Sequence, residues 1–205
     1  MHNLIPDKTE SAVILLHGLG ADGADLIALG HEWHGTLPHT AFYSPDAPFA
    51  CDMAPMGYQW FSLREWTTAS ITKGLDEAVP FAEKIISEVR LAHNLPASKI
   101  VLAGFSQGAM LSLHTGLQRT EQLAGIIAMS GALFVKPSSI TAKPPVLLTH
   151  GTMDEVVPIA GSDQAAEVLQ KAGVKTALHR IEGLGHGIDS ACLDLGAKFL
   201  HAAFG

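Results

Sequence analysis

A serine between two glycines is the side chain in this sequence best placed to do chemistry. The pentapeptide Gly104-Phe105-Ser106-Gln107-Gly108 begins at the end of the apolar run KIVLAGF. Its last glycine is the first residue of GAMLSLHTGLQ, which has helical spacing. A G-x-S-x-G between a strand and a helix is typical of a nucleophile elbow, whose glycines permit a sharp turn that exposes the serine hydroxyl. The pattern predicts that Ser106 is a nucleophile.

A serine nucleophile needs a base that takes its proton and an acid that holds the base in the right tautomer. Asp154 is the strongest candidate acid, because it lies in HGTMDEVVP directly after the apolar run PVLLTH. Its alternative interpretation is an ordinary turn-forming aspartate. Two rival carboxylates fit less well, since Asp163 falls inside a helical pattern and Asp189 is placed to cap the last helix.

His186 is the candidate base, since it stands in the glycine-rich loop GLGHGID after the run TALHRIE. The chain has 11 histidines, so any single one is more often structural than catalytic. Chain order separates them, because enzymes built on this elbow run nucleophile, acid, base. His150 precedes Asp154, and His179 lies inside a predicted strand. Only His186 completes the order that starts at Ser106.

Attack on a carbonyl group produces an oxyanion that needs hydrogen-bond donors. We expect one donor to be the backbone N–H of Gln107, at the positive end of the helix that follows the elbow. The loop His17-Gly18-Leu19-Gly20, after the run AVILL, is placed to give a second N–H, from Leu19. His17 is expected to pack within this loop and not to act as a second base.

The same loop also reads GLGADG, a G-x-G-x-x-G pattern that would indicate dinucleotide binding. Against it, Asp22 and Asp25 lie in or near the first turn of the following helix, where they would repel a pyrophosphate. Asp46 follows the next predicted strand only after Ser44-Pro45. The segment His31-Glu32-Trp33-His34 lacks the order of a zinc motif and is interpreted as a helix face. We expect no cofactor and no metal.

Short apolar runs alternate with longer helical patterns along the chain, and continuous apolar runs favour strands buried on both faces. The alternation predicts an α/β fold with a mostly parallel central sheet and helices on both faces, in a single domain over residues 1–205. Pro80 is expected near the first turn of its helix, where proline is tolerated. The expected strands are 12–17, 40–45, 99–105, 123–130, 145–150 and 176–182, and the expected helices are 76–93, 107–119, 159–172 and 189–203.

Residues 44–74 do not fit this alternation, because they hold three prolines, two tryptophans and little periodicity. Long ordered loops are usually lids or binding loops. The alternative is a surface loop anchored by Trp60 and Phe61 as core residues. Both interpretations stay open at this point.

Composition excludes several classes of protein. The net charge is −7 and no Lys/Arg cluster occurs, so the chain lacks the basic face that nucleic-acid binding requires. No run of about 18 apolar residues appears, and the start lacks a basic segment followed by an apolar one. We therefore expect a cytoplasmic protein without stable membrane insertion. Cys51 and Cys192 are expected to be reduced thiols.

Five segments occur in order: LHGLGADG, PDAP followed by GYQWF, GFSQG, HGTMDEVVP and GLGHGI. Together they resemble the phospholipase/carboxylesterase family of small α/β-hydrolases, which includes bacterial carboxylesterases and acyl-protein thioesterases. The resemblance spans nearly the whole chain and implies an α/β-hydrolase fold that hydrolyses acyl esters or thioesters. It also implies that Ser106, Asp154 and His186 form the triad, and that Leu19 and Gln107 form the oxyanion hole.

The substrate is expected to be a small-molecule or lipid acyl ester, or an acylated protein. The segment between Gly131 and Pro145 is too short for a large cap, so we expect a site open to bulky leaving groups. A lysophospholipase or acyl-protein thioesterase role and a non-catalytic binding module are the alternatives. The expected assembly is a monomer or a homodimer.

The acyl side of the site is expected to be apolar. Trp60, Phe61 and Val157 are the candidate substrate-binding residues, with Leu19 and the segment Leu133-Phe134 as further candidates. Each of them is individually as well explained as a core residue.

Overall fold

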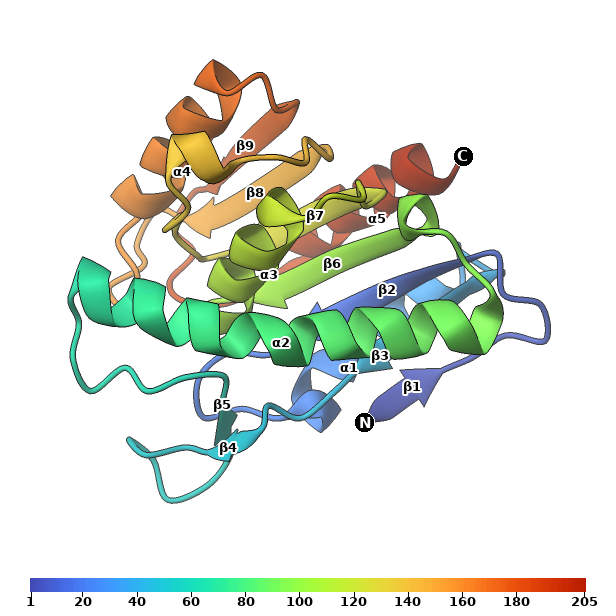
Figure 1. Cartoon of the computed structure of the whole chain (residues 1–205), viewed down its shortest axis with the longest axis horizontal. Coiled ribbons are helices and arrows are strands. Elements are labelled where there is room, and N and C mark those ends of the chain that lie inside the picture. The colour runs from blue at the N-terminus through green and yellow to red at the C-terminus, as the bar shows by residue number, and fades with distance from the viewer.

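A seven-stranded sheet forms the centre of the molecule in the computed structural model, which describes residues 1–205. Its strands are β1 His2–Leu4, β2 Ser11–Leu16, β3 Thr40–Ser44, β6 Ile100–Phe105, β7 Gly125–Met129, β8 Val146–Gly151 and β9 Thr176–Ile181. They lie in the order β1-β3-β2-β6-β7-β8-β9 (Figure 1). Only β1 pairs antiparallel, and every other pairing is parallel. The predicted mostly parallel sheet is confirmed.

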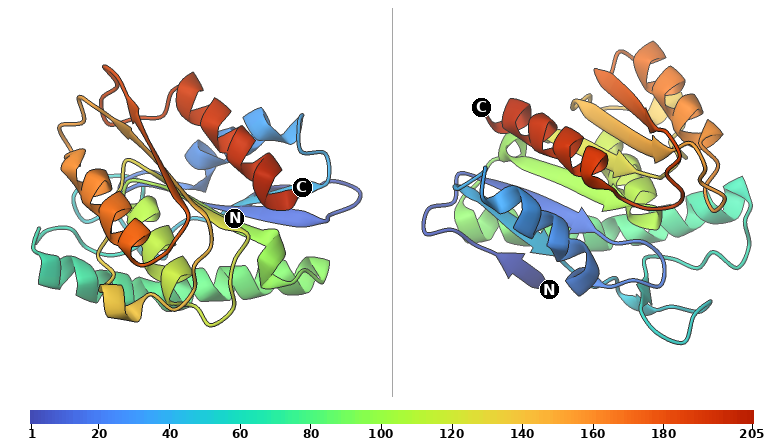
Figure 2. Two further views of the ribbon diagram at one scale, coloured as in Figure 1. Left: turned by 90° about the horizontal axis from the view of Figure 1, so that it is seen from above. Right: turned by 180° about the vertical axis from the view of Figure 1, so that it is seen from behind.

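Five α-helices cover the two faces of this sheet. They are α1 Gly23–His34, α2 Thr68–His93, α3 Gln107–Gln118, α4 Ala160–Lys171 and α5 Ser190–Phe204. One face carries α2, α3 and α4, and the other carries α1 and α5 (Figure 2). Every residue of β2 and β3 is buried, as expected for strands sandwiched between helices. The predicted two-sided α/β-hydrolase architecture is confirmed.

The sheet changes its direction of growth at β2. From β2 the chain adds β3 on one side, and it later adds β6 on the other side. In parallel sheets of this kind, ligands bind beyond the carboxyl ends of the strands at such a switch point. The ends of the two strands are level, since Leu16 of β2 pairs with Gly104 of β6. The loops after β2 and β6 therefore meet at one place.

The structure corrects the prediction for Pro80. The helix α2 begins at Thr68, not near residue 76, so Pro80 lies in its interior. A proline there removes the hydrogen bond to the carbonyl four residues earlier, which belongs to Asp76. Both Pro80 and Asp76 are exposed, so this carbonyl lies on the solvent side of the helix. An exposed helix face thus accommodates the proline without ending the helix.

The irregular segment that starts after β3 forms a small hairpin and then returns to the core. Its two strands are β4 Phe49–Ala50 and β5 Tyr58–Gln59, and they project beside the main sheet (Figure 1). Directly after β5, Trp60 and Phe61 are buried in the largest hydrophobic cluster. The core-anchor interpretation is therefore confirmed for these two side chains. A lid or binding role for the hairpin stays a prediction.

The connection between β7 and β8 contains one short 3₁₀ turn, Pro137–Ser139, and no further helix or strand. The predicted absence of a large cap at this place is confirmed. None of the helices combines the length and the apolar composition needed to cross a membrane. Both cysteines are free, as expected.

Candidate active site

The backbone of Ser106 is strained as a nucleophile elbow requires. Its φ of 53° and ψ of −116° lie in a region that side-chain-bearing residues rarely adopt. The glycines on either side are obligatory: a Cβ on Gly104 would lie 2.2 Å from the Gly108 carbonyl oxygen, and one on Gly108 would lie 1.9 Å from the Leu16 oxygen. The Ser106 hydroxyl makes no capping bond to α3. It is left free to react.

The candidate acid and the candidate base are hydrogen-bonded to each other. Nδ1 of His186, from the loop after β9, lies 2.7 Å from Oδ2 of Asp154, from the loop after β8. The other oxygen, Oδ1, accepts bonds from the backbone N–H groups of Val156 and Val157, both at 2.9 Å. Burial raises the pKa of Asp154, but the bonds from His186, Val157 and Val156 outweigh it and hold this pKa below its usual value. The carboxylate is therefore ionised near neutral pH.

The imidazole of His186 lies beside the elbow. Its ring packs at a tilt against Phe105, the residue before Ser106, with ring centroids 4.8 Å apart. Nδ1 is engaged by Asp154, whereas Nε2 has no hydrogen-bond partner within the protein. The structure contains no hydrogen bond between Ser106 and His186, a bond that often forms only with substrate present. Nε2 is thus the ring nitrogen available for proton transfer.

Two backbone N–H groups near Ser106 are without partners. Gln107 is the first residue of α3, so its N–H has no acceptor within the helix. The N–H of Leu19 donates to no group of the protein. The loop that holds it reaches the elbow, because a Cβ on Gly18 would lie 3.3 Å from the Ser106 Cβ. Both predicted oxyanion donors therefore lie in segments that border the serine.

His17 holds the loop after β2 in place. Its Nδ1–H donates to the carbonyl oxygen of Gly18 at 2.7 Å, and its Nε2 accepts from the N–H of Ala47 at 2.9 Å. Its own carbonyl oxygen accepts from the indole N–H of Trp60 at 2.9 Å. Burial lowers the pKa of His17, which keeps the ring neutral, as an accepting nitrogen requires. The predicted packing role of His17 fits this geometry.

Two polar side chains at the site were missed by reasoning from the sequence. The side chain of Gln107 is fully buried and bonds the backbone of Trp60 and Phe61. His150, set aside because it precedes Asp154, lies with Nε2 3.2 Å from Oδ2 of that aspartate. A signal for the second existed, since His150 lies at the end of β8 and Asp154 follows four residues later in the loop after that strand.

The three candidate acyl-binding residues are all core residues in the structure. Trp60, Phe61 and Val157 are buried in one hydrophobic cluster, and the Trp60 indole is only 1% exposed. Contact of these three with a substrate stays a prediction. Partly buried side chains on the surface of the same cluster include Leu19 and Phe134. These two combine apolar character with accessible area beside the loops of the site.

Carboxylates occupy the helix terminus that a dinucleotide would need. Asp22 and Asp25 form a reciprocal capping box at the start of α1, and Asp46 accepts from the N–H of Gly23 at 2.9 Å. Negative charge already fills the position where a pyrophosphate would sit. The segment 31–34 forms the last turn of α1, in agreement with its interpretation as a helix face.

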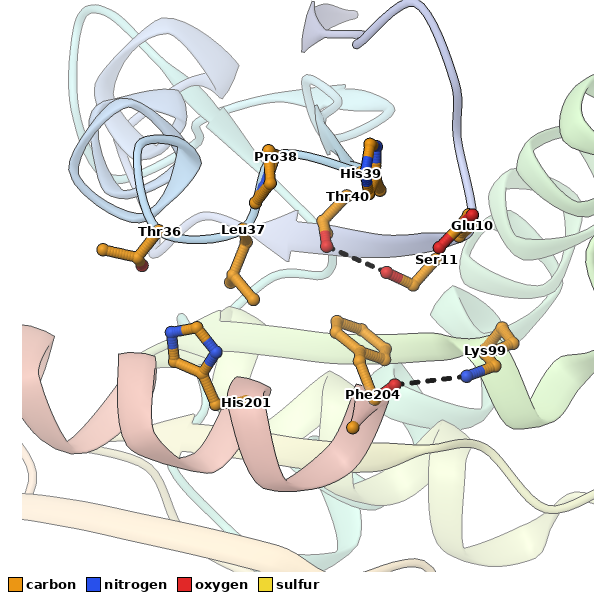
Figure 3. Close-up of a pocket in the computed structure, with 11 residues that line it drawn as sticks. Glu10, Ser11, Thr36, Leu37, Pro38, His39, Thr40, Lys99, His201 and Phe204 are labelled. Carbon is orange, nitrogen blue, oxygen red and sulfur yellow. Dashed lines mark hydrogen bonds between the residues drawn. The ribbon is translucent and has the colours of Figure 1, made fainter.

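A separate polar pocket of about 220 Å³ lies at the other edge of the sheet, where β2 and β3 begin (Figure 3). Ser11 and Thr40 are hydrogen-bonded in its wall at 2.8 Å, and Lys99 bonds the Phe204 carbonyl across it at 3.3 Å. These residues stand at the amino ends of the strands, whereas Ser106 follows the carboxyl end of β6. The pocket does not belong to the candidate active site.

Comparison with known proteins gives consistent matches over the whole chain. A family model described as Phospholipase/Carboxylesterase matches residues 5–204. An acyl-protein thioesterase 1 homologue from Dictyostelium discoideum is 33% identical, covering 94% of this chain and 90% of the relative. Acyl-protein thioesterase 1 from Eremothecium gossypii is 32% identical, with 93% and 87% covered. The crystal structure of esterase PE8 superposes with a TM-score of 0.94 at 39% identity, covering 98% of this chain and 97% of that one.

Proposed function

The chain belongs to the phospholipase/carboxylesterase family of α/β-hydrolases, and we propose that Ser106, His186 and Asp154 carry out its hydrolysis of carboxylic esters or thioesters. The observation that carries this assignment is the strained backbone of Ser106 at the switch point of the sheet. Such strain persists only where the surrounding structure imposes it, and it is concentrated at functional sites.

In the first half of the reaction, His186 Nε2 removes the proton of the Ser106 hydroxyl while the serine oxygen attacks the acyl carbonyl. The imidazolium then gives this proton to the leaving alcohol or thiol, and an acyl-enzyme remains. In the second half, His186 takes a proton from water as its oxygen attacks the acyl-enzyme. The bond between the acyl carbon and the Ser106 oxygen then breaks, the imidazolium returns its proton to that oxygen, and the carboxylic acid leaves. Asp154 keeps the imidazole oriented and stabilises its charged form.

The oxyanion of each tetrahedral intermediate is stabilised by the backbone N–H groups of Gln107 and Leu19. Support for this role comes from their lack of other partners and from the position of Gln107 at the positive end of α3. Preorganised donors of this kind are among the largest contributions to catalysis, commonly about 3 kcal/mol for one donor.

The proposed substrate site has an apolar part that binds the acyl chain and an open part that receives the leaving group. Leu19 and Phe134 supply apolar surface next to the buried cluster that contains Trp60, Phe61 and Val157. The lack of a cap between β7 and β8 leaves room for a large leaving group. Because curated relatives are acyl-protein thioesterases, S-acylated protein is the second candidate substrate, beside small-molecule and lipid esters.

The central test replaces the nucleophile. Ser106→Ala is expected to lower hydrolysis of a p-nitrophenyl acyl ester by several orders of magnitude while the protein stays folded. It is also expected to abolish labelling by a fluorophosphonate probe. Ser112→Ala is the matched control on the same helix, because that hydroxyl is buried and bonds the Gly108 carbonyl oxygen at 2.8 Å. Full activity of Ser106→Ala would remove the serine from the mechanism.

The ester and thioester alternatives are separated by their leaving groups. Purified enzyme is given the same acyl chain on an alcohol, on a small thiol and on a cysteine of a peptide, and kcat/KM is compared. A preference of tenfold or more for the acylated peptide supports the thioesterase role. Equal values for the three substrates favour a general carboxylesterase.

A further inference from the structure

His150 is a buried histidine at the site that the mechanism above does not use. It is the fifth residue of β8, it is 1% exposed, and it lies four residues before Asp154. Its ring contacts both the loop that carries the acid and the helix α4. A buried imidazole needs a partner for each nitrogen, so its contacts determine where its protons are.

The Nε2 atom of His150 carries a proton. It lies 2.8 Å from the carbonyl oxygen of Val157 and 3.2 Å from Oδ2 of Asp154. A carbonyl oxygen and an ionised carboxylate only accept hydrogen bonds, so the ring nitrogen between them must donate. Its N–H donates to the Val157 carbonyl oxygen, and the ring edge lies in contact with Oδ2 of Asp154.

The opposite nitrogen, Nδ1, lies 2.7 Å from the hydroxyl oxygen of Ser162 on α4. This hydroxyl has one proton and a second neighbour, the carbonyl oxygen of Gly131, at 3.2 Å. The histidine thus joins the acid loop to α4 through one ring. If Nδ1 were lost, Ser162 would still have an acceptor in Gly131.

Asp154 has three hydrogen-bond donors, and their placement is specific. Val156 and Val157 bond Oδ1, whereas His186 bonds Oδ2, which also lies 3.2 Å from Nε2 of His150. The side chain of Asp154 is completely buried, so no water competes for these positions. A carboxylate held at both oxygens cannot rotate away from His186.

We propose that His150 is a positioning residue for the triad. Its Nε2–H holds the carbonyl oxygen of Val157, whose own N–H bonds Oδ1 of Asp154, and its ring lies against Oδ2, so the carboxylate stays directed at Nδ1 of His186. The proposal rests on the catalytic roles proposed above for Ser106, His186 and Asp154. With Val157 held in this way, Oδ1 keeps its two backbone donors and Oδ2 stays on the Nδ1 proton of His186. The base then keeps one tautomer through both halves of the reaction.

Two substitutions separate this role from simple packing. The side-chain amide of His150→Gln can place an N–H where Nε2 stood, so the Val157 carbonyl keeps its donor, and Ser162 falls back on Gly131. The shorter amide of His150→Asn stays near the Nδ1 position, so it keeps a partner for Ser162 but leaves the Val157 carbonyl without its donor and Oδ2 of Asp154 without the ring beside it. The two variants are polar, buried and alike in chemistry.

We expect His150→Asn to lower kcat by about tenfold to a hundredfold with KM changed less than about threefold, a loss of the size that removal of a histidine's outer partner causes at metal sites. His150→Gln is expected to retain kcat within about threefold. His114→Asn serves as a matched control, because His114 is also buried and lies 2.8 Å from a carboxylate, Asp76, away from the site. It should lower the melting temperature without lowering kcat.

A spectroscopic measurement keeps the inference separate from the proposed function. The His186 Nδ1–H proton bonded to Asp154 is expected as a low-field ¹H NMR signal that disappears in His186→Gln. It should shift or broaden in His150→Asn and stay in place in His150→Gln. Equal kcat and an unshifted signal in the folded Asn variant would overturn the role of His150. Absence of esterase activity in the wild-type protein would overturn the proposed function instead.

Discussion

The side-chain Oε1 of Gln107 accepts a hydrogen bond from the backbone N–H of Trp60 at 2.8 Å, which ties the first residue of α3 to the segment after the β4–β5 hairpin. The Nε2 of the same amide donates to the carbonyl oxygen of Phe61, also at 2.8 Å. One buried side chain thus satisfies two buried backbone groups. The residue that offers its own N–H to an oxyanion also fixes the wall of the site.

Gln107→Leu tests this link. The substitution keeps the backbone N–H and a similar volume, but it leaves the Trp60 N–H and the Phe61 carbonyl without partners. We expect a loss of about 3 kcal/mol in the free energy of unfolding, measured by urea denaturation. Gln118→Leu, at the exposed end of the same helix, should change it by less than about 0.5 kcal/mol. Equal effects of the two substitutions would argue against the link.

Gly108→Ala tests the steric requirement of the elbow. The new Cβ would lie 1.9 Å from the Leu16 carbonyl oxygen, a backbone atom that cannot move without disturbing β2. We expect destabilisation of about 3 kcal/mol or more, or failure to fold. Gly35→Ala is the control, since a Cβ there meets nothing within 4 Å and φ is −61°. That change should be neutral or slightly stabilising, and a wild-type urea midpoint for Gly108→Ala would contradict the geometry.

The sequence was sufficient for the parts of the fold that depend on local pattern. The six expected runs became the six parallel strands, and for the first five of them in chain order burial on both faces leaves no alternation to misread. The sixth, β9, is the edge strand and is only partly buried. The loops that follow these strands then bring Asp154 and His186 together. Chain order and the position after a strand are local properties, and they were enough to select this pair.

The features that the sequence did not reveal depend on contacts between distant segments. Nothing near Gln107 in the sequence indicates that its amide bonds residues 60 and 61. Pro80 was misplaced because the first turn is the usual site for a helical proline, whereas here solvent exposure of the helix face made an interior position acceptable. His150 was judged only as a base, and its bond to the Val157 carbonyl and its position beside Asp154 emerge from the folding of the loop.

His17 predicts a pH dependence of stability. Its pKa is lowered in the folded protein by burial, from an ordinary value of 6.5. Below pH 6.5 the unfolded state therefore binds a proton that the folded state does not, and stability falls as the pH decreases through this window. Above pH 6.5 neither state binds the proton, and the contribution is constant.

His17→Gln isolates this effect, because an amide oxygen can accept from the Ala47 N–H but does not titrate. The free energy of unfolding is measured in urea from pH 5 to pH 8 for both proteins. The decline below pH 6.5 should be shallower in the variant, by at most one proton, or about 1.4 kcal/mol per pH unit. Asp154 does not interfere, because its pKa is lowered in the folded protein. The stability that the ionised carboxylate contributes is lost only as the pH falls below 3.8, the ordinary pKa of this group. Parallel curves for the two proteins would show that His17 is not held neutral.

Asp154→Asn tests which carboxylate is the acid of the triad. The asparagine can still accept from Val156 and Val157, but its amide presents an N–H to His186 and favours the wrong tautomer of the base. In triads of this kind the change lowers kcat by about 10⁴-fold, and we expect a loss of that order with p-nitrophenyl esters. Asp163→Asn is the control: this rival carboxylate bonds Arg180 on the surface, so the change should leave kcat intact and cost under about 1 kcal/mol. If instead Asp163→Asn removed activity and Asp154→Asn retained it, the loop after β8 would not supply the acid.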